Sequence, residues 1–160
     1  MKKSGANGFT LIEVLIAVII IGIIAGIAYP NYVKFVTEAR RSDATTNLTR
    51  IAALQNRFYL TCNPVKYAAN FGAANSCVGA GTLKADLTGN ITRDGHYIIV
   101  IASLPVAEGG LANLATDYKL IAIPTGSQLV NDGSKVSAIS LSSTGQKSAV
   151  GTEAASAWKH

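Results

Sequence analysis

The chain begins with one long apolar run and continues into a segment whose apolar positions repeat at helical spacing. The run from Phe9 to Tyr29 contains a single charged residue, Glu13. About 20 apolar residues are enough to cross a bilayer as a helix. From Asn31 to about Leu60 the steps of three and four residues predict an amphipathic helix that continues the first, with a mostly apolar stripe formed by Val33, Val36, Ala44, Leu48, Ile51, Gln55 and Phe58.

The pattern changes twice beyond this helix. Residues 61–95 are rich in Gly, Ala, Asn and Thr without a clear period, so we expect a long loop there. One long helix followed by three or four antiparallel strands predicts an α+β fold, with the outer half of the helix packed on the sheet. Alternating, β-branched and aromatic residues predict these strands at 96–102, at 118–123, at 136–143 and, as a last short strand, after Gly145.

Length and charge bound the function classes. The 160 residues carry 14 Lys and Arg against 9 Asp and Glu, a net charge of +5. Without the apolar run, enough chain is left for one small domain with its own core. A mildly basic balance is not by itself a nucleic-acid signature. The sequence shows no Ser-His-Asp order, paired-carboxylate motif or Walker-type phosphate loop, so we expect neither an enzyme nor a bound cofactor.

The two cysteines are interpreted together with the orientation of the apolar run. Lys2 and Lys3 precede the run, and basic residues favour the cytoplasmic side of a membrane, so the rest of the chain is expected to face outward. An exported chain with an even cysteine count favours a disulfide, here between Cys62 and Cys77. Two isolated cysteines with His96 match no zinc spacing, so we expect no metal site.

Glu13 is the feature that a plain membrane anchor does not explain. An acidic group at the bilayer centre costs about 2.5–3.5 kcal/mol on insertion scales, so it persists where a partner offsets that cost. The obvious partner is a free amine. An ordinary secretory signal does not fit either, because its apolar region is only about 7–15 residues long and ends at an Ala-x-Ala-like site.

The leader Lys2 to Gly8 and the following segment Phe9 to Ile16 closely resemble the class III leader and N-terminal segment of type IV prepilins. The resemblance implies that a prepilin peptidase cuts between Gly8 and Phe9 and methylates the new N-terminal Phe9. It also implies that Glu13 neutralises the N-terminal amine of a neighbouring subunit during assembly. The implied organisation is a leader peptide at 1–8, a transmembrane and assembly helix at 9–30, and a globular pilin domain at 31–160 that contains an amphipathic helix (31–60), a loop (61–95) and a sheet with the C-terminal region (96–160).

The C-terminal half is also similar to the PilE-like minor pilins and the related DNA-uptake (ComP-like) pilins. Their closing pattern has one cysteine before an alternating strand and a second cysteine before a tryptophan. Here the strand lies within Val136 to Gly145 and the tryptophan is Trp158, but the two cysteine positions hold Val136 and Ala157. That disulfide is therefore absent, and we expect the Cys62–Cys77 bridge to stiffen a different loop.

These resemblances imply a structural subunit, of the minor class, of a type IV pilus that serves adhesion, twitching motility or pilus priming. Its implied partners are other pilin subunits, the prepilin peptidase and an inner-membrane assembly platform. Its implied location is the bacterial inner membrane before assembly and the extracellular pilus afterwards. On the amphipathic helix, Arg40 and Arg41 are expected either on a solvated face or in contact with acidic groups of neighbouring subunits. A pseudopilin of a type II secretion system shares the same N-terminus and fold plan and is an alternative.

A second alternative is a DNA-receptor pilin used in natural transformation. Cationic side chains supply most non-specific affinity for DNA, and Tyr67 and Phe71 could stack on exposed bases. The same cations could equally be scattered solubilising charges. The candidate phosphate contacts are Lys66, Lys84, Arg93, Lys119, Lys135 and Lys147.

Overall fold

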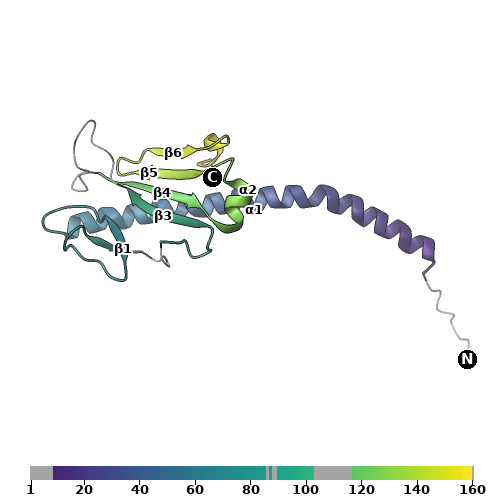
Figure 1. The fold of residues 1–160 in the computed structure, drawn as a ribbon, viewed down its shortest axis with the longest axis horizontal. Coiled ribbons are helices and arrows are strands. Elements are labelled where there is room, and N and C mark those ends of the chain that lie inside the picture. Colours follow the sequence, from purple (N-terminus) through teal and green to yellow (C-terminus); the bar gives the residue numbers. More distant parts are fainter. Residues whose placement is uncertain (1–8, 86, 88–89, 103–116, 160) are drawn as a thin grey trace, which may run out of the picture. The chain divides into compact units, whose positions relative to one another are not determined.

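The computed structural model describes residues 9–85, 87, 90–102 and 117–159 (Figure 1). The chain divides into two compact units, Met1–Val36 and Thr37–His160. In chain order the elements are α1 (Leu11–Thr61), β1 (Asn70–Gly72), β2 (Thr82–Lys84), β3 (Tyr97–Ala102), β4 (Lys119–Pro124), α2 (Gly126–Asp132), β5 (Ala138–Ser142), β6 (Lys147–Val150) and the short 3-10 helix η1 (Ala154–Ser156).

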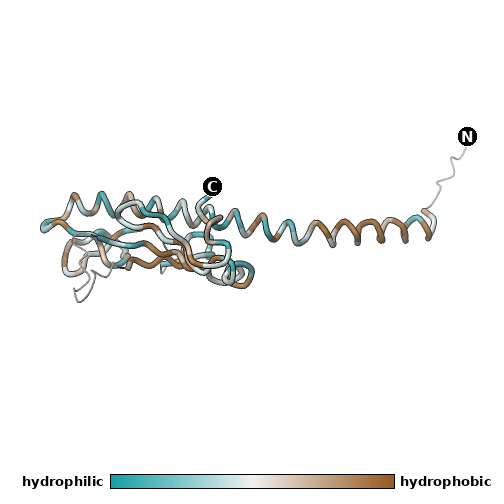
Figure 2. The backbone as a smooth tube through the Cα atoms, turned by 90° about the horizontal axis from the view of Figure 1, so that it is seen from above, coloured by the Kyte–Doolittle hydropathy of each residue, from teal (hydrophilic) through white to brown (hydrophobic). Residues whose placement is uncertain are grey.

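The first unit contains the apolar half of α1. Thr10 lies just before the first turn of the helix, and the Glu13 amide donates a hydrogen bond of 3.3 Å to Thr10 Oγ1, which satisfies one of the unpaired donors at the helix start. The segment is long and apolar enough to cross a membrane, and none of its most apolar part is buried. Figure 2 shows this apolar stretch along the N-terminal part of α1. A single continuous helix confirms the predicted extension of the apolar segment into the amphipathic one.

The second unit has a core built between the rest of α1 and a four-stranded antiparallel sheet of order β3-β4-β5-β6. Alternate strand residues face the helix, and the register places Leu120 opposite Leu141 and Ala122 opposite Ile139. This α+β arrangement confirms the predicted fold class. On α1 the buried line begins at Thr37 rather than at the predicted Val33, and it then follows steps of four and three residues through Arg41, Ala44, Leu48, Ile51, Gln55 and Phe58.

Two short strands interrupt the segment that was predicted to be a loop. β1 and β2 pair in parallel, with Asn70 opposite Thr82. The buried Gln55 side chain holds this segment against α1, because its Nε2 donates to the Ala68 carbonyl at 2.9 Å and its Oε1 accepts from the Ala68 amide at 3.0 Å. Strands of three residues held by a side-chain amide carry no periodic signal, which is why the pattern did not predict them.

The predicted disulfide between Cys62 and Cys77 is present, with a Cα–Cα distance of 5.5 Å. Cys62 follows the last turn of α1, and Cys77 lies between β1 and β2. In the chain-entropy model, a disulfide that closes a loop of this size stabilises the folded state by about 3 kcal/mol. The bridge therefore fastens the β1–β2 segment to the end of α1.

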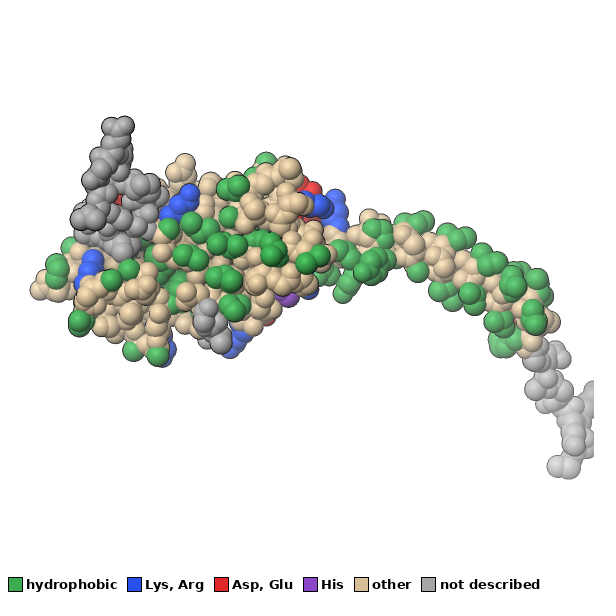
Figure 3. Space-filling view, viewed as in Figure 1, with side chains coloured by type: hydrophobic (Ala, Val, Ile, Leu, Met, Phe, Trp, Pro, Cys, Tyr) green, Lys and Arg blue, Asp and Glu red, His purple; other side chains and the backbone are tan. Residues whose placement is uncertain are grey.

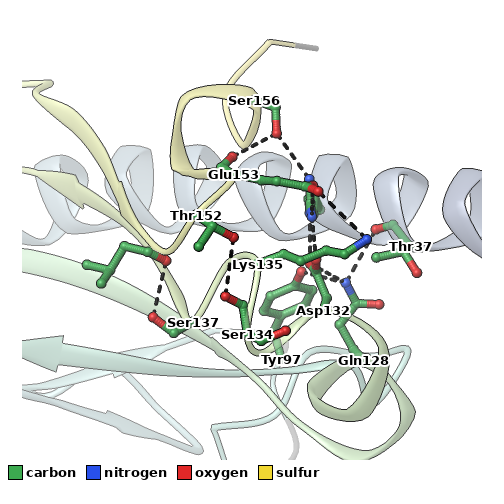
Figure 4. Close-up of polar contacts among 12 residues, drawn as sticks. Thr37, Tyr97, Gln128, Asp132, Ser134, Lys135, Ser137, Thr152, Glu153 and Ser156 are labelled. Atoms are coloured by element: carbon green, nitrogen blue, oxygen red, sulfur yellow. Dashed lines mark hydrogen bonds and ion pairs between the residues drawn. The ribbon is translucent and has the colours of Figure 1, made fainter.

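Arg41 is almost fully buried and joins three elements through Asp132, Glu153 and Ser156, which Figure 4 labels. Its Nε donates to Asp132 Oδ2 at 2.7 Å, and its Nη2 donates to Asp132 Oδ1 and, at 2.9 Å, to Glu153 Oε2. Its Nη1 donates to Ser156 Oγ at 3.1 Å. The hydrogen bond with Asp132 is the main reason that the pKa of Arg41 lies above its ordinary value. Both predicted alternatives for Arg41, a solvated face and a contact with a neighbouring subunit, are therefore wrong, because the residue is buried and its charge is paired inside the chain. Arg40 donates to Ser127 Oγ at 3.1 Å.

Gln128 extends this cluster into the core. It is fully buried, and its Nε2 lies 3.0 Å from Asp132 Oδ2, 3.1 Å from Tyr97 Oη and 3.3 Å from the Thr37 carbonyl oxygen. Burial raises the pKa of Tyr97 to about 12, so the phenol stays neutral beside the Asp132 carboxylate. The short helix α2, which the sequence pattern did not predict, is thus held by polar contacts on its buried side.

We expect Leu48→Ala to lower the free energy of unfolding of the second unit by about 2–5 kcal/mol, because it opens a cavity at a fully buried position. Val130→Ala is the control: Val130 is 85% exposed, and surface changes of this kind stay within about 0.5 kcal/mol. Denaturant unfolding of the detergent-solubilised chain, followed by the fluorescence of its single tryptophan, measures both variants. Equal effects of the two changes would contradict this core.

We expect Glu153→Gln to make the thermal stability less dependent on pH below neutrality. The hydrogen bond from Arg41 lowers the pKa of Glu153 in the folded chain. As the pH falls, Glu153 is therefore protonated at a higher pH in the unfolded chain than in the folded one. The contribution is complete above the ordinary glutamate pKa of about 4.3 and is lost as the pH falls through the folded value. The melting temperatures of the wild type and the variant should differ at pH 7 and converge in acid. Asp94→Asn, an exposed carboxylate outside the cluster, is the control, and a constant difference at all pH values would contradict the ion pair.

Candidate assembly segment and nucleic-acid surface

The candidate assembly segment lies at the start of α1. Phe9 is 83% exposed, and Glu13 lies in the first helical turn, where a negative charge interacts favourably with the helix dipole. Among the described residues, Glu13 forms no ion pair. Gly8, the predicted cleavage position, lies outside the described residues. The geometry thus presents one carboxylate on an exposed apolar helix, with no cation paired to it in the described part of the chain.

The predicted DNA contacts do not form one surface. Lys119 alternates with the buried Leu120 on β4 and therefore lies on the outer face of the sheet. Lys147 pairs opposite Leu141 and so belongs to the helix-facing side of β6. Two other predicted DNA contacts already interact with groups of the same chain. Lys66 Nζ donates to the Gly79 carbonyl at 2.7 Å, and Lys135 Nζ lies 3.7 Å from Glu153 Oε1. Arg93 lies in the segment that leads into β3.

The outer face of the sheet is largely apolar around β3 and β4. Val100 is 38% exposed and Ile123 is 40% exposed. In the strand register, Val100 lies opposite Ile121, and Ile123 lies opposite Ile98. Figure 3 shows apolar side chains gathered over these strands. A phosphate backbone needs cations rather than branched aliphatic side chains, so this face is a poor match for nucleic acid.

The two aromatic residues predicted to stack on bases have different surroundings. Tyr67 is stacked on Tyr59, with ring centres 4.7 Å apart, and meets the Tyr118 ring edge-on at 4.6 Å. Burial raises the pKa of Tyr67, in agreement with its place in this cluster. Phe71 instead lines a surface hollow together with Lys84. Phe71 and Lys84 therefore line the same hollow, whereas Tyr67 packs against two other tyrosines of the chain.

A groove that the sequence did not indicate lies between α1 and β6. Its volume is about 560 Å³. Trp158 forms part of its wall, and its Nε1 donates to the Ser148 carbonyl at 3.0 Å while Lys147 Nζ lies 5.2 Å from the ring centre. No spacing in the sequence relates Arg50 to Trp158, because the two residues lie on segments far apart in the chain. The side chains that define this Arg50–Trp158 groove are Thr45, Thr46, Thr49, Arg50, Ala53, Lys147 and Trp158.

Two family models together cover most of the chain. The prokaryotic N-terminal methylation motif matches residues 3–29. The model described as type IV minor pilin ComP, DNA uptake sequence receptor, matches residues 30–134. The first match covers the apolar helix and the second covers most of the elements from the middle of α1 to α2.

Relatives with curated names are similar over shorter stretches. The type IV major pilin protein PilA of Myxococcus xanthus is 50% identical over 53 residues, which are 33% of this chain and 24% of that protein. The type IV narrow pilus major component PilA5 of Thermus thermophilus is 41% identical over 66 residues, 38% of this chain and 57% of that protein. The fimbrial protein EcpC of Eikenella corrodens is 48% identical over 44 residues, 28% of this chain and 29% of that protein. The chain thus spans less than two thirds of the length of each of these relatives.

A solved structure of a type IV pilin from Shewanella oneidensis aligns with 69% of this chain and 89% of its own, at 22% identity and a TM-score of 0.41. The methylation motif on an apolar helix places the protein in the inner membrane before assembly and in the extracellular pilus afterwards. The match that extends from Pro30 to Ser134 identifies the globular part. The chain is a type IV pilin and belongs to the family of the type IV minor pilin ComP.

Proposed function

We propose that this chain is a minor structural subunit of a type IV pilus, cleaved after Gly8, methylated at Phe9 and polymerised through its N-terminal helix. The observation that carries the proposal is Glu13, a single carboxylate without an ion-pair partner among the described residues, four positions after Phe9 on an exposed apolar helix. Cleavage at Gly8 creates the amine that can pair with it. Such a pair formed between subunits offsets the cost of holding a carboxylate in an apolar environment.

The apolar helix supplies the contact area for polymerisation. Its side chains are exposed in the single chain, and the most apolar part is not buried at all. Before assembly these side chains are covered by lipid, whereas in a filament they are covered by the same helices of other subunits. Residues 1–8 are then the leader, 9–30 the assembly helix and 31–160 the exposed globular domain.

The partners in this proposal follow from the steps. A prepilin peptidase is needed to cut and methylate the chain, and an inner-membrane platform is needed to transfer the helix from lipid to filament. Other pilins surround the subunit once it is incorporated. A filament built in this way serves adhesion, twitching motility or the priming of pilus growth, and none of these roles requires chemistry by the subunit itself.

A second role, as a DNA receptor, is favoured by one specific observation. The family model that matches residues 30–134 describes a receptor for a DNA uptake sequence. The net charge of +5 and the cations of the second unit are compatible with a polyanionic ligand. The two roles are compatible, because a receptor on a pilus must also be incorporated into it.

We expect Glu13→Ala to be cleaved and methylated normally but to be lost from filaments. The cleavage position is unchanged, whereas the carboxylate that pairs with a neighbouring amine is gone. Mass spectrometry of sheared filaments and of membranes should find the peptide that begins at methylated Phe9 only in the membranes. Asp94→Ala removes an exposed carboxylate from the second unit and is the control. Normal incorporation of Glu13→Ala would refute the proposed role of Glu13.

We expect the detergent-solubilised chain to bind DNA with an affinity that falls steeply with salt. Each phosphate contact that a cation makes with a duplex adds about 0.9 to the slope of log K against log salt concentration. Fluorescence anisotropy of labelled DNA over a series of salt concentrations measures that slope. Polyglutamate, which carries charge without bases, is the control competitor. Absence of binding at low salt would remove the receptor role and leave the structural role intact.

A further inference from the structure

We infer that the Arg50–Trp158 groove binds a single-stranded segment of DNA, with a base stacked on Trp158 and the adjoining phosphates paired with Arg50 and Lys147. The inference rests on the proposed DNA-receptor role and names a site for it. It differs from the sequence prediction, because only Lys147 belonged to the predicted contacts.

The charges of the groove favour an anionic ligand. Arg50 comes from α1 and Lys147 from β6, so cations approach the groove from two elements. Both side chains are exposed, and neither forms an ion pair among the described residues. No carboxylate lines the groove in the described part of the chain. Glu153, which follows β6, is held by Arg41 and Lys135 and does not neutralise these cations.

Trp158 supplies an oriented aromatic surface. Its Nε1 is already bonded to the Ser148 carbonyl, so the indole offers its ring rather than a hydrogen-bond donor. A second hollow, of about 390 Å³, also has Trp158 and Lys147 in its wall, so the indole borders open space in two places. Lys147 lies over the ring on a flexible stem, and its ammonium can turn toward a phosphate while a base covers the indole. Stacking of this kind tolerates any base, because every base has an aromatic face.

The threonines of α1 select which part of the ligand lies against them. Thr45 Oγ1 and Thr46 Oγ1 donate to the Ser42 carbonyl at 2.8 and 2.9 Å, and Thr49 Oγ1 donates to the Thr45 carbonyl at 2.9 Å. Each hydroxyl hydrogen is therefore used inside the helix, and the oxygens are left as acceptors. Acceptors repel phosphate oxygens and attract the N–H groups of base edges, which in thymine is the ring N3–H. The helix side of the groove thus fits a base edge, while the cations fit the backbone.

The strand must be single at this point. A base in a duplex is covered on both faces by its neighbours, whereas a base in a single strand or at a frayed end can expose one face to an indole. The groove volume of about 560 Å³ lies within the usual range for small-ligand sites, about 300–1,000 Å³, and so accommodates part of one strand.

The single tryptophan makes the inference directly testable. The full chain in detergent is titrated with a short oligothymidine, and binding is followed in parallel by the anisotropy of a labelled strand and by the fluorescence of Trp158. We expect Trp158 to be quenched with the same midpoint as the anisotropy change. Arg50→Gln and Lys147→Gln should each weaken binding several-fold and lower the salt slope by about 0.7. Trp158→Leu should weaken binding about 10-fold in the anisotropy assay.

Lys84→Gln is the matched control, because it removes an exposed cation beside an aromatic residue, Phe71, in a different hollow. Unchanged Trp158 fluorescence with normal binding by Arg50→Gln and Lys147→Gln would overturn the groove and leave the receptor role standing. A loss of affinity in Lys84→Gln alone would place the site at Phe71 and also overturn it. Equal binding of a closed duplex without quenching would refute stacking. A flat anisotropy at low salt would remove the receptor role and this site together.

Discussion

The buried charge of Arg41 is the constraint on which the arrangement of the second unit depends. Removing a guanidinium from water costs several kcal/mol, and only well-placed carboxylates and further hydrogen bonds offset that cost. Asp132 comes from α2 and Glu153 from the segment after β6, so both must close on α1 before the charge is satisfied. The hydrogen bond from Arg41 to Ser156 also holds this residue, and with it the nearby Trp158, beside α1. The Arg50–Trp158 groove is thus a consequence of the Arg41 cluster.

The parts of this fold that could be predicted are those with a repeated signal. The apolar line of α1, the β-branched runs of β3 and β4 and the apolar–polar alternation of β5 each extend over several residues, so the sequence indicates a helix and strands there. β1, β2 and α2 are too short for such a signal and are held by Gln55 and Gln128. Arg41 was misassigned because a charge on a helix is usually solvated, and its partner Asp132 is 91 positions away in the sequence. No local pattern encodes that pairing.

The candidate sites also divide into those that the sequence predicts and those that it does not. Gly8, Phe9 and Glu13 follow from a motif in which spacing along one chain is itself the information. The six predicted cationic contacts were chosen by charge alone, and charge does not report which face of a strand a side chain occupies. Lys119 and Lys147 therefore lie on opposite faces of the sheet. Arg50 and Trp158 come together only through tertiary structure, because the Arg41 cluster fixes the C-terminal segment beside α1.

The two units meet different physical requirements. The proposed filament assembly depends on the first unit, whereas the proposed DNA binding depends on the second. The buried residues of α1 begin at Thr37, so the core of the second unit is complete without the apolar segment. That segment in turn buries nothing in the single chain and depends on lipid or on other helices. Changes at Arg50, Lys147 or Trp158 therefore alter a surface of the second unit without removing an apolar contact needed for polymerisation. A pilin built in this way can gain or lose a ligand while its place in the filament is retained, so the proposed structural role and the proposed DNA-receptor role do not exclude each other.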